Sequence, residues 1–307
     1  MKTNIRRIAL RTAIVLAGAV VCFLAFAYWY DSRGQRPDPQ FNSKVEHPAY
    51  TDTGPEILFD EGHQNFHTME NGYKPFADLL RNDGYRIRAN RGPFTASMLT
   101  GVSTLVIVNA LGPDGHETRP AFTDAECTTI ADWVASGGSL LLVADHSPFG
   151  SAARNLAASF GVKMFLRYAR DDENSDGDNE RLVFSRSNGL LVDHPITEGR
   201  DASERLNKVV TFTGQSLTGP PGSVPFLKLA DNAYDWESRK VRYPARGHAQ
   251  GIALQFGKGR VVVLGEAAVL TAQIDPLGFK FGMNRPGSDD RQFVLNIMHW
   301  LSGLLPS

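Results

Sequence analysis

Short apolar runs alternate with amphipathic stretches along the first half of the chain. Each run is continuous and bounded by turn-forming residues, which is typical of strands buried in a sheet. The clearest helix signal between them is the capping box Thr123-Asp124-Ala125-Glu126. Expected strands cover 56–59, 85–89, 104–108 and 140–144, and expected helices cover 74–82, 123–137 and 151–160. This alternation predicts an α/β fold with a doubly wound, mostly parallel sheet.

The second half of the chain is less regular. Residues 167–181 are strongly charged and are expected to form a loop. Two apolar runs, 251–256 and 260–264, flank Gly257-Lys258-Gly259, which indicates a β-hairpin with a short glycine turn. A terminal helix is expected from about residue 290 to 304. We therefore predict one α/β domain over 56–305, preceded by a polar linker over 31–55 and an N-terminal segment over 1–30.

The N-terminal segment contains an apolar run from Thr12 to Tyr30 that has no charged residue and closes on three aromatic residues. Its length suits a helix crossing about 30 Å of hydrocarbon. More basic residues precede the run than closely follow it, which favours a cytoplasmic N-terminus. The sequence therefore predicts a single-pass protein of a bacterial inner membrane, with a periplasmic or extracellular C-terminal domain. A signal peptide cleaved after Ala25-Phe26-Ala27 is the alternative interpretation.

Composition narrows the range of partners. A net charge of −1 and a pI near 6.7 lack the basic footprint of a nucleic-acid-binding protein. The two cysteines, Cys22 and Cys127, offer no disulfide framework, so the core must supply the stability. The expected partners are the membrane, through the N-terminal helix, and an envelope protein or a small ligand.

Unusual polar clusters stand where three of the expected strands end. Because ligands of open parallel sheets bind at the carboxyl ends of the strands, these clusters define a candidate pocket. Carboxylates and imidazoles together can bind a divalent metal or divide acid and base roles. The candidate residues are Asp60, Glu61, His63, His67, Asp145, His146, Ser147 and Glu266. The alternative is that these residues cap helices, brace loops or pack as satisfied structural histidines.

A second candidate site lies in the charged loop. Its spacing follows the D-x-N-x-D-G pattern of a calcium loop, but Val183 stands where an EF-hand has its bidentate glutamate. A solvated acidic loop is the alternative interpretation. The candidate ligands are Asp172, Asn174, Asp176, Asp178 and Glu180.

Several segments resemble an uncharacterised bacterial family that is often membrane-anchored. They are ILFDEGHQNFHT, LLLVADHSPFGSAARNLAASFGV, LLVDHPITEG, VVTFTGQSL, GKGRVVVLGEAAVLTAQ and FVLNIMHWLSG. The resemblance covers roughly 56–305 and implies a class I glutamine-amidotransferase-like, flavodoxin-like fold. It implies no defined activity.

The sequence departs from the amidotransferase pattern at the residues that carry glutaminase chemistry, so we do not expect that activity. Amidotransferases carry a cysteine nucleophile on the turn after a central strand, and the matching turn here is Asp145-His146-Ser147. Their His-x-Glu motif is missing too, although Glu266 stands near its place. Ser147 could replace the nucleophile, but Pro148 follows it and no G-x-S-x-G elbow is present.

Two functional hypotheses follow from the sequence. The first is a binding module of the cell envelope that recognises a small ligand or a partner. The alternative is a metal-assisted hydrolase in which Asp60, His63, Asp145, His146 and Glu266 supply metal ligands and a general base. A structural component of a membrane assembly is a third class, for which the sequence offers little.

Overall fold

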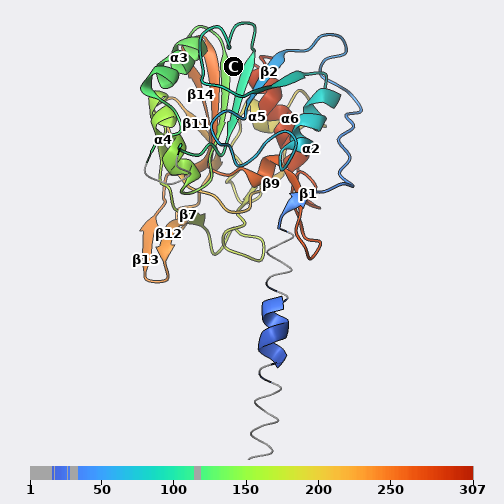
Figure 1. The fold of residues 1–307 in the computed structure, drawn as a ribbon, viewed down its shortest axis with the longest axis vertical. Helices are drawn as coiled ribbons and strands as arrows, with labels where there is room; N and C mark the ends of the chain where they lie inside the picture. The colour runs from blue at the N-terminus through green and yellow to red at the C-terminus, as the bar shows by residue number, and fades with distance from the viewer. Residues whose placement is uncertain (1–15, 17, 26, 28–33, 114–118, 307) are drawn as a thin grey trace, which may run out of the picture. The chain divides into compact units, whose positions relative to one another are not determined.

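The computed structural model describes residues 16, 18–25, 27, 34–113 and 119–306. The chain divides into two units. The smaller comprises residues 1–36 and 274–279, and the larger comprises residues 37–273 and 280–307. The larger unit contains every candidate site residue. It also contains the main sheet (Figure 1).

The prediction of a membrane anchor is corrected by the structure. Among the described residues, no helix is both long enough and apolar enough to cross a membrane. Much of the predicted anchor, including residues 12–15 and 28–30, lies outside the described residues. The expected membrane partner, single-pass topology and inner-membrane localisation lose their support with it.

Five parallel strands form the first part of the nine-stranded main sheet. Strand β2 (Glu56–Asp60) pairs with β3 (Arg86–Asn90) and β4 (Thr104–Val108), β4 pairs with β5 (Ser139–Val143), and β5 pairs with β15 (Gly259–Leu264). Helices α2 (Lys74–Asn82) and α3 (Asp124–Ala135) provide the crossovers. This part confirms the expected strands and both helices.

The rest of the main sheet is antiparallel, so the predicted doubly wound, mostly parallel sheet is wrong. The order is β3-β2-β4-β5-β15-β14-β10-β6, with β11 also on β14. The predicted hairpin of β14 (Ala249–Phe256) and β15 is confirmed. Its short turn permits only an antiparallel pair, because a parallel connection needs a crossover of a dozen or more residues. Strands β10 (Leu217–Thr218), β6 (Lys163–Met164) and β11 (Val224–Lys228) continue the antiparallel pattern.

Helices cover both faces of the main sheet. Successive strand residues point to opposite faces, so Ile57 and Phe59 join one core while Leu58 joins the other. The first core contains residues of α2 and α6 (Asp290–Leu301), and the second contains residues of α3 and α4 (Phe149–Ser159). Figure 1 shows α3 and α4 on one side of the strands and α2 and α6 on the other.

Short elements complete the fold. A three-stranded sheet contains β7 (Tyr168–Arg170), β12 (Tyr234–Ser238) and β13 (Val241–Pro244), and β8 (Val183–Ser185) pairs with β9 (Lys208–Val210). The remaining pieces are β1 (Arg36–Pro37), α5 (Pro195–Glu198), η1 (Ala268–Leu270), β16 (Ala272–Ile274) and β17 (Lys280–Gly282).

Candidate functional site

The five parallel strands all end near a polar side chain. Parallel strands bring their carboxyl ends to one edge of the sheet, so these side chains share that edge, which we call the strand-end edge. The residues are Asp60, Asn90, Asn109, Asp145 and Glu266. All except Asp145 are almost completely buried. Buried polar groups need hydrogen-bond partners, so their partners decide what these residues can do.

The first predicted cluster forms a closed bridge. His63 Nδ1 lies 2.9 Å from both carboxylate oxygens of Asp60, and His63 Nε2 lies 3.0 Å from Glu126 Oε1. The imidazole stacks on Phe94, with ring centroids 4.8 Å apart. Burial lowers the pKa of His63, but the two carboxylates outweigh this and raise it overall. Both ring nitrogens are therefore occupied within the protein.

Glu126 joins this bridge to the capping box predicted for α3. Its Oε2 accepts hydrogen bonds from the Thr123 backbone N–H and hydroxyl, while its Oε1 also accepts from the Phe94 backbone N–H at 3.0 Å. Burial opposes ionisation of Glu126, but these donors and His63 lower its pKa to about 2. The carboxylate thus fixes the helix start, the loop before Phe94 and the imidazole together.

The second cluster brings Asp145 and Glu266 to the same backbone segment. Asp145 Oδ1 accepts from the Ala267 N–H at 2.7 Å, and Asn109 Nδ2 donates to Asp145 Oδ2 at 2.7 Å. The two oxygens of Glu266 accept from the N–H groups of Ala268 and Val269 at the start of η1. Burial raises the pKa of both carboxyls, and the charge of Asp145 adds to the rise at Glu266. Asp145 and Glu266 together bind the backbone N–H groups at the start of η1. Because two like charges lie close together, one of these carboxyl groups is favoured to carry a proton.

Three of the other predicted pocket residues also have hydrogen-bond partners inside the protein. Ser147 Oγ lies 2.6 Å from Ser151 Oγ, and His146 Nδ1 lies 2.7 Å from the Ser147 carbonyl, so this histidine nitrogen does not face the serine hydroxyl. Glu61 accepts from the Met69 N–H. Burial lowers the pKa of His67 to about 4, which keeps that imidazole neutral.

The charged loop also uses its acidic side chains internally. Asp172 accepts from Asn179 and Tyr234, Asp176 pairs with Arg285, and Glu180 pairs with Arg170. Asp178 and Asn174 make local loop contacts. Within the described part of the chain, no group of three or more His, Cys, Asp and Glu side chains could hold a metal ion. The predicted calcium loop therefore gains no support from side-chain geometry.

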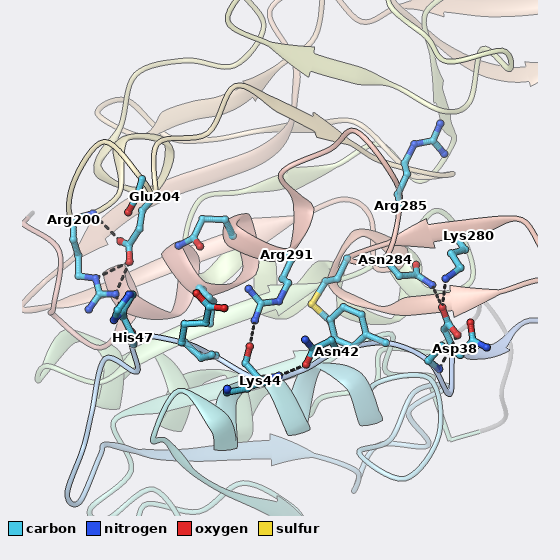
Figure 2. Close-up of a pocket in the computed structure, with 18 of the residues that line it drawn as sticks. Asp38, Asn42, Lys44, His47, Arg200, Glu204, Lys280, Asn284, Arg285 and Arg291 are labelled. Atoms are coloured by element: carbon cyan, nitrogen blue, oxygen red, sulfur yellow. Dashed lines mark hydrogen bonds and ion pairs between the residues drawn. The ribbon is translucent and has the colours of Figure 1, made fainter.

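A charged cavity of about 760 Å³ lies elsewhere, beside the first turns of α6. Its walls come from residues 38–47, from the segment after α5, from β17 and the turn that follows it, and from α6 (Figure 2). The charged lining residues are Asp38, Lys44, Glu46, His47, Arg200, Asp201, Glu204, Lys280, Arg285 and Arg291. The polar segment expected to act as a linker thus forms one wall of the cavity.

Ion pairs occupy the two ends of the cavity. At one end Arg200 and Glu204 pair through two guanidinium nitrogens, and at the other Lys280 Nζ lies 2.9 Å from Asp38 Oδ2. Between them, Arg291 Nη2 donates to the Lys44 carbonyl at 2.6 Å. Figure 2 shows Arg291 between the two ends, with Lys44 and Asn42 close by.

Sequence reasoning missed this cavity because its residues carry no motif. Lys44 lies in a polar segment that is typical of a linker, and Arg291 opens a helix whose apolar face dominates its pattern. The only available signal was the alternation of basic and acidic residues in the segments that line the cavity. Such alternation is common on solvated surfaces, so it does not identify a site.

Comparison with known proteins identifies a family and a fold. The sequence model of a family described as a domain of unknown function, DUF4350, matches residues 65–273. No curated protein matches the chain. The N-terminal domain of mmIFT52 has a TM-score of 0.57 at 17% identity, covering 80% of this chain and 97% of that one. A cytoplasmic protein from Salmonella typhimurium has a TM-score of 0.48 at 12% identity, covering 80% and 98%. At 17% identity the likeness to the mmIFT52 domain concerns the fold alone.

Proposed function

We propose that this chain, which belongs to the DUF4350 family of domains of unknown function, is a binding module that holds a small ligand in its charged cavity. A volume of about 760 Å³ suits a small organic molecule, since such sites commonly span about 300–1,000 Å³. In this proposal the residues of the candidate pocket at the strand-end edge contribute to the fold, and the ligand contacts come from segments without a motif.

The observation that carries this proposal is the saturation of the strand-end edge. A general base must reach the proton it abstracts, and a nucleophile must face a base. His63 is bound at both nitrogens, Glu266 is bound to two backbone N–H groups, and Ser147 faces another serine. The alternative of a metal-assisted hydrolase draws no support from the described residues, which offer no three-ligand set.

A blocking substitution tests the proposed site. Asn42 is exposed and lines the cavity, so Asn42→Trp should fill the cavity without disturbing the core. Small organic compounds screened by ligand-observed NMR against the full chain should bind the wild type and lose binding to this variant. The matched control is Asn71→Trp, an equal change at an exposed residue away from the cavity, which should bind as the wild type does.

A second measurement addresses catalysis directly. Turnover of chromogenic carboxylate and phosphate esters, with and without added zinc or manganese, should equal the background rate. Turnover that Ser147→Ala or His63→Gln abolishes would contradict the proposal and favour a hydrolase at the strand-end edge. Binding that survives Asn42→Trp would place the ligand outside the cavity.

A further inference from the structure

Two cations of the cavity have no ion-pair partner among the described residues. Five lysine and arginine side chains line it, and three of these have acidic partners: Arg200 with Glu204, Lys280 with Asp38, and Arg285 with Asp176. Among the residues that the structure describes, neither Lys44 nor Arg291 makes an ion pair. These two residues lie between the ion-paired ends of the cavity (Figure 2).

The guanidinium of Arg291 has N–H donors that could bind an oxyanion. The residue is half-buried, and loss of solvent lowers the pKa of its guanidinium, although Asp83 and Glu46 oppose the shift. A guanidinium presents five N–H donors in a planar fork, and the described hydrogen bonds engage one nitrogen, Nη2, on the Lys44 carbonyl. The remaining donors match the two oxygens of a carboxylate or a phosphate group.

The position of Arg291 strengthens this preference. It stands in the first turn of α6, a helix of 12 residues whose N-terminal end carries a partial positive charge. Asp290, the preceding residue, is completely buried and accepts from the Val210 N–H, so its carboxylate is turned to the interior of the fold. Lys44, which lines the cavity from the segment 38–47, carries a second full charge.

The remaining walls indicate the size and character of the ligand. Phe41, Val45, Met283 and Leu295 give the cavity an apolar part that can cover a carbon skeleton. Glu46 and Asp201 also line the cavity and are exposed, and they would repel a ligand with many negative charges. This combination fits one or two negative charges on an organic body and disfavours polyphosphates and nucleic acids.

We propose that the cavity binds a small organic oxyanion, a carboxylate or a phosphate monoester, through Arg291 and Lys44. This inference rests on the proposed binding function and specifies its ligand class. The guanidinium grips the oxyanion, the ammonium neutralises it, and the apolar wall holds its carbon skeleton. The ion pairs at both ends of the cavity keep the walls in place around it.

Four probes that share one aromatic ring test the ligand class. Phenyl phosphate and benzoate carry the oxyanion, while benzyl alcohol and benzylamine are the neutral and cationic counterparts. Titrated calorimetrically into the full chain at low salt, at least one anion should bind with a dissociation constant of about 10 mM or tighter, and the other two should not. Comparing phenyl phosphate with benzoate shows which oxyanion the site prefers.

Variants then test whether Arg291 and Lys44 bind the anion. Arg291→Ala should weaken anion binding at least about tenfold, Arg291→Lys should retain part of it, and Lys44→Ala should weaken it less. Arg154→Ala removes the same charge from an exposed position on α4 outside the cavity and should change nothing. Higher salt should weaken binding by the wild type more than by Arg291→Ala.

The outcomes separate the ligand class from the binding function. Binding of benzyl alcohol or benzylamine that Asn42→Trp blocks and Arg291→Ala does not weaken would overturn the oxyanion class and leave the cavity as a binding site. Failure of all four probes to bind the wild type would overturn the class as stated. If the compound screen of the wild type also yields no ligand that Asn42→Trp displaces, the proposed function fails as well.

Discussion

The strand-end edge and the charged cavity differ in how their charges are satisfied. At the edge, the carboxylates of Glu126, Asp145 and Glu266 accept hydrogen bonds from donors of their own chain, and those donors belong to helix starts and loops. In the cavity, ion pairs secure the two ends, while Lys44 and Arg291 between them make no ion pair among the described residues. The edge therefore stabilises the fold, and the cavity retains capacity to bind something else. The polar residues that stand out in the sequence already have partners inside the protein. The residues that can bind a ligand are others, and they carry no sequence motif.

The largest expected effect is at Asp60. This completely buried carboxylate accepts from Asn65, Asn90 and the Gly62 N–H, in addition to its bridge with His63. Asp60→Ala leaves those donors and the imidazole unpaired, so it should lower the free energy of unfolding by about 3–5 kcal/mol. Urea denaturation of both proteins measures the difference.

A surface carboxylate provides the matched control. Asp78 pairs with Lys74 and Arg81 on the outer side of α2. Asp78→Ala should lower the free energy of unfolding by at most about 1 kcal/mol, because solvent screens such pairs. Equal losses for the two variants would contradict the view that the strand-end edge is a structural network.

The pH dependence of the free energy of unfolding tests the bridge between His63, Asp60 and Glu126, with a smaller expected effect than Asp60→Ala. Its pKa is raised in the folded protein above the ordinary value of 6.5, so its protonated form is favoured by folding. The stability it contributes is full below pH 6.5 and is lost as the pH rises through the raised pKa. The stability advantage of the wild type over His63→Gln should therefore be larger near about pH 6 than near about pH 9, as measured by urea denaturation.

His67 is the internal control for the sign of this effect. Its folded pKa is about 4, below the ordinary value, so protonation favours the unfolded chain. The wild type should lose stability relative to His67→Gln as the pH falls from 6.5 towards 4, which is the opposite direction. If the stability difference between the wild type and His63→Gln changed with pH in the same direction as that for His67→Gln, Asp60 and Glu126 would not hold a charged imidazole.

The contrast also explains what the sequence could predict. Continuous apolar runs such as 104–108 and the capping box at Thr123 are local signals, and they gave strands and helices close to the observed ones. Which strands pair is not local. The antiparallel half depends on short strands such as β6 and β10, two residues each, which leave no periodic pattern to read.

The candidate site was predictable only in part. The chain order placed Asp60 beside His63, and parallel strands placed Asp145 near Glu266, so the sequence indicated both clusters. It could not show that Glu126, a capping residue from another element, would occupy the second nitrogen of His63. It could not indicate the cavity either, because Lys44 and Arg291 are 247 residues apart in sequence and come together only in the folded chain.

The smallest expected effect on stability is at Arg291, and it completes the comparison. Arg291→Met retains an apolar stem against the cavity wall and removes a half-desolvated guanidinium. The lost partner is the carbonyl of exposed Lys44, which water can replace. The free energy of unfolding should therefore stay within about 0.5 kcal/mol of the wild type in the same urea measurement. A loss as large as that of Asp60→Ala would show that Arg291 ties residues 38–47 to α6 and is structural after all. An unchanged free energy of unfolding together with weakened anion binding would separate the two regions. Arg291 would then be needed for ligand binding and not for the stability of the fold.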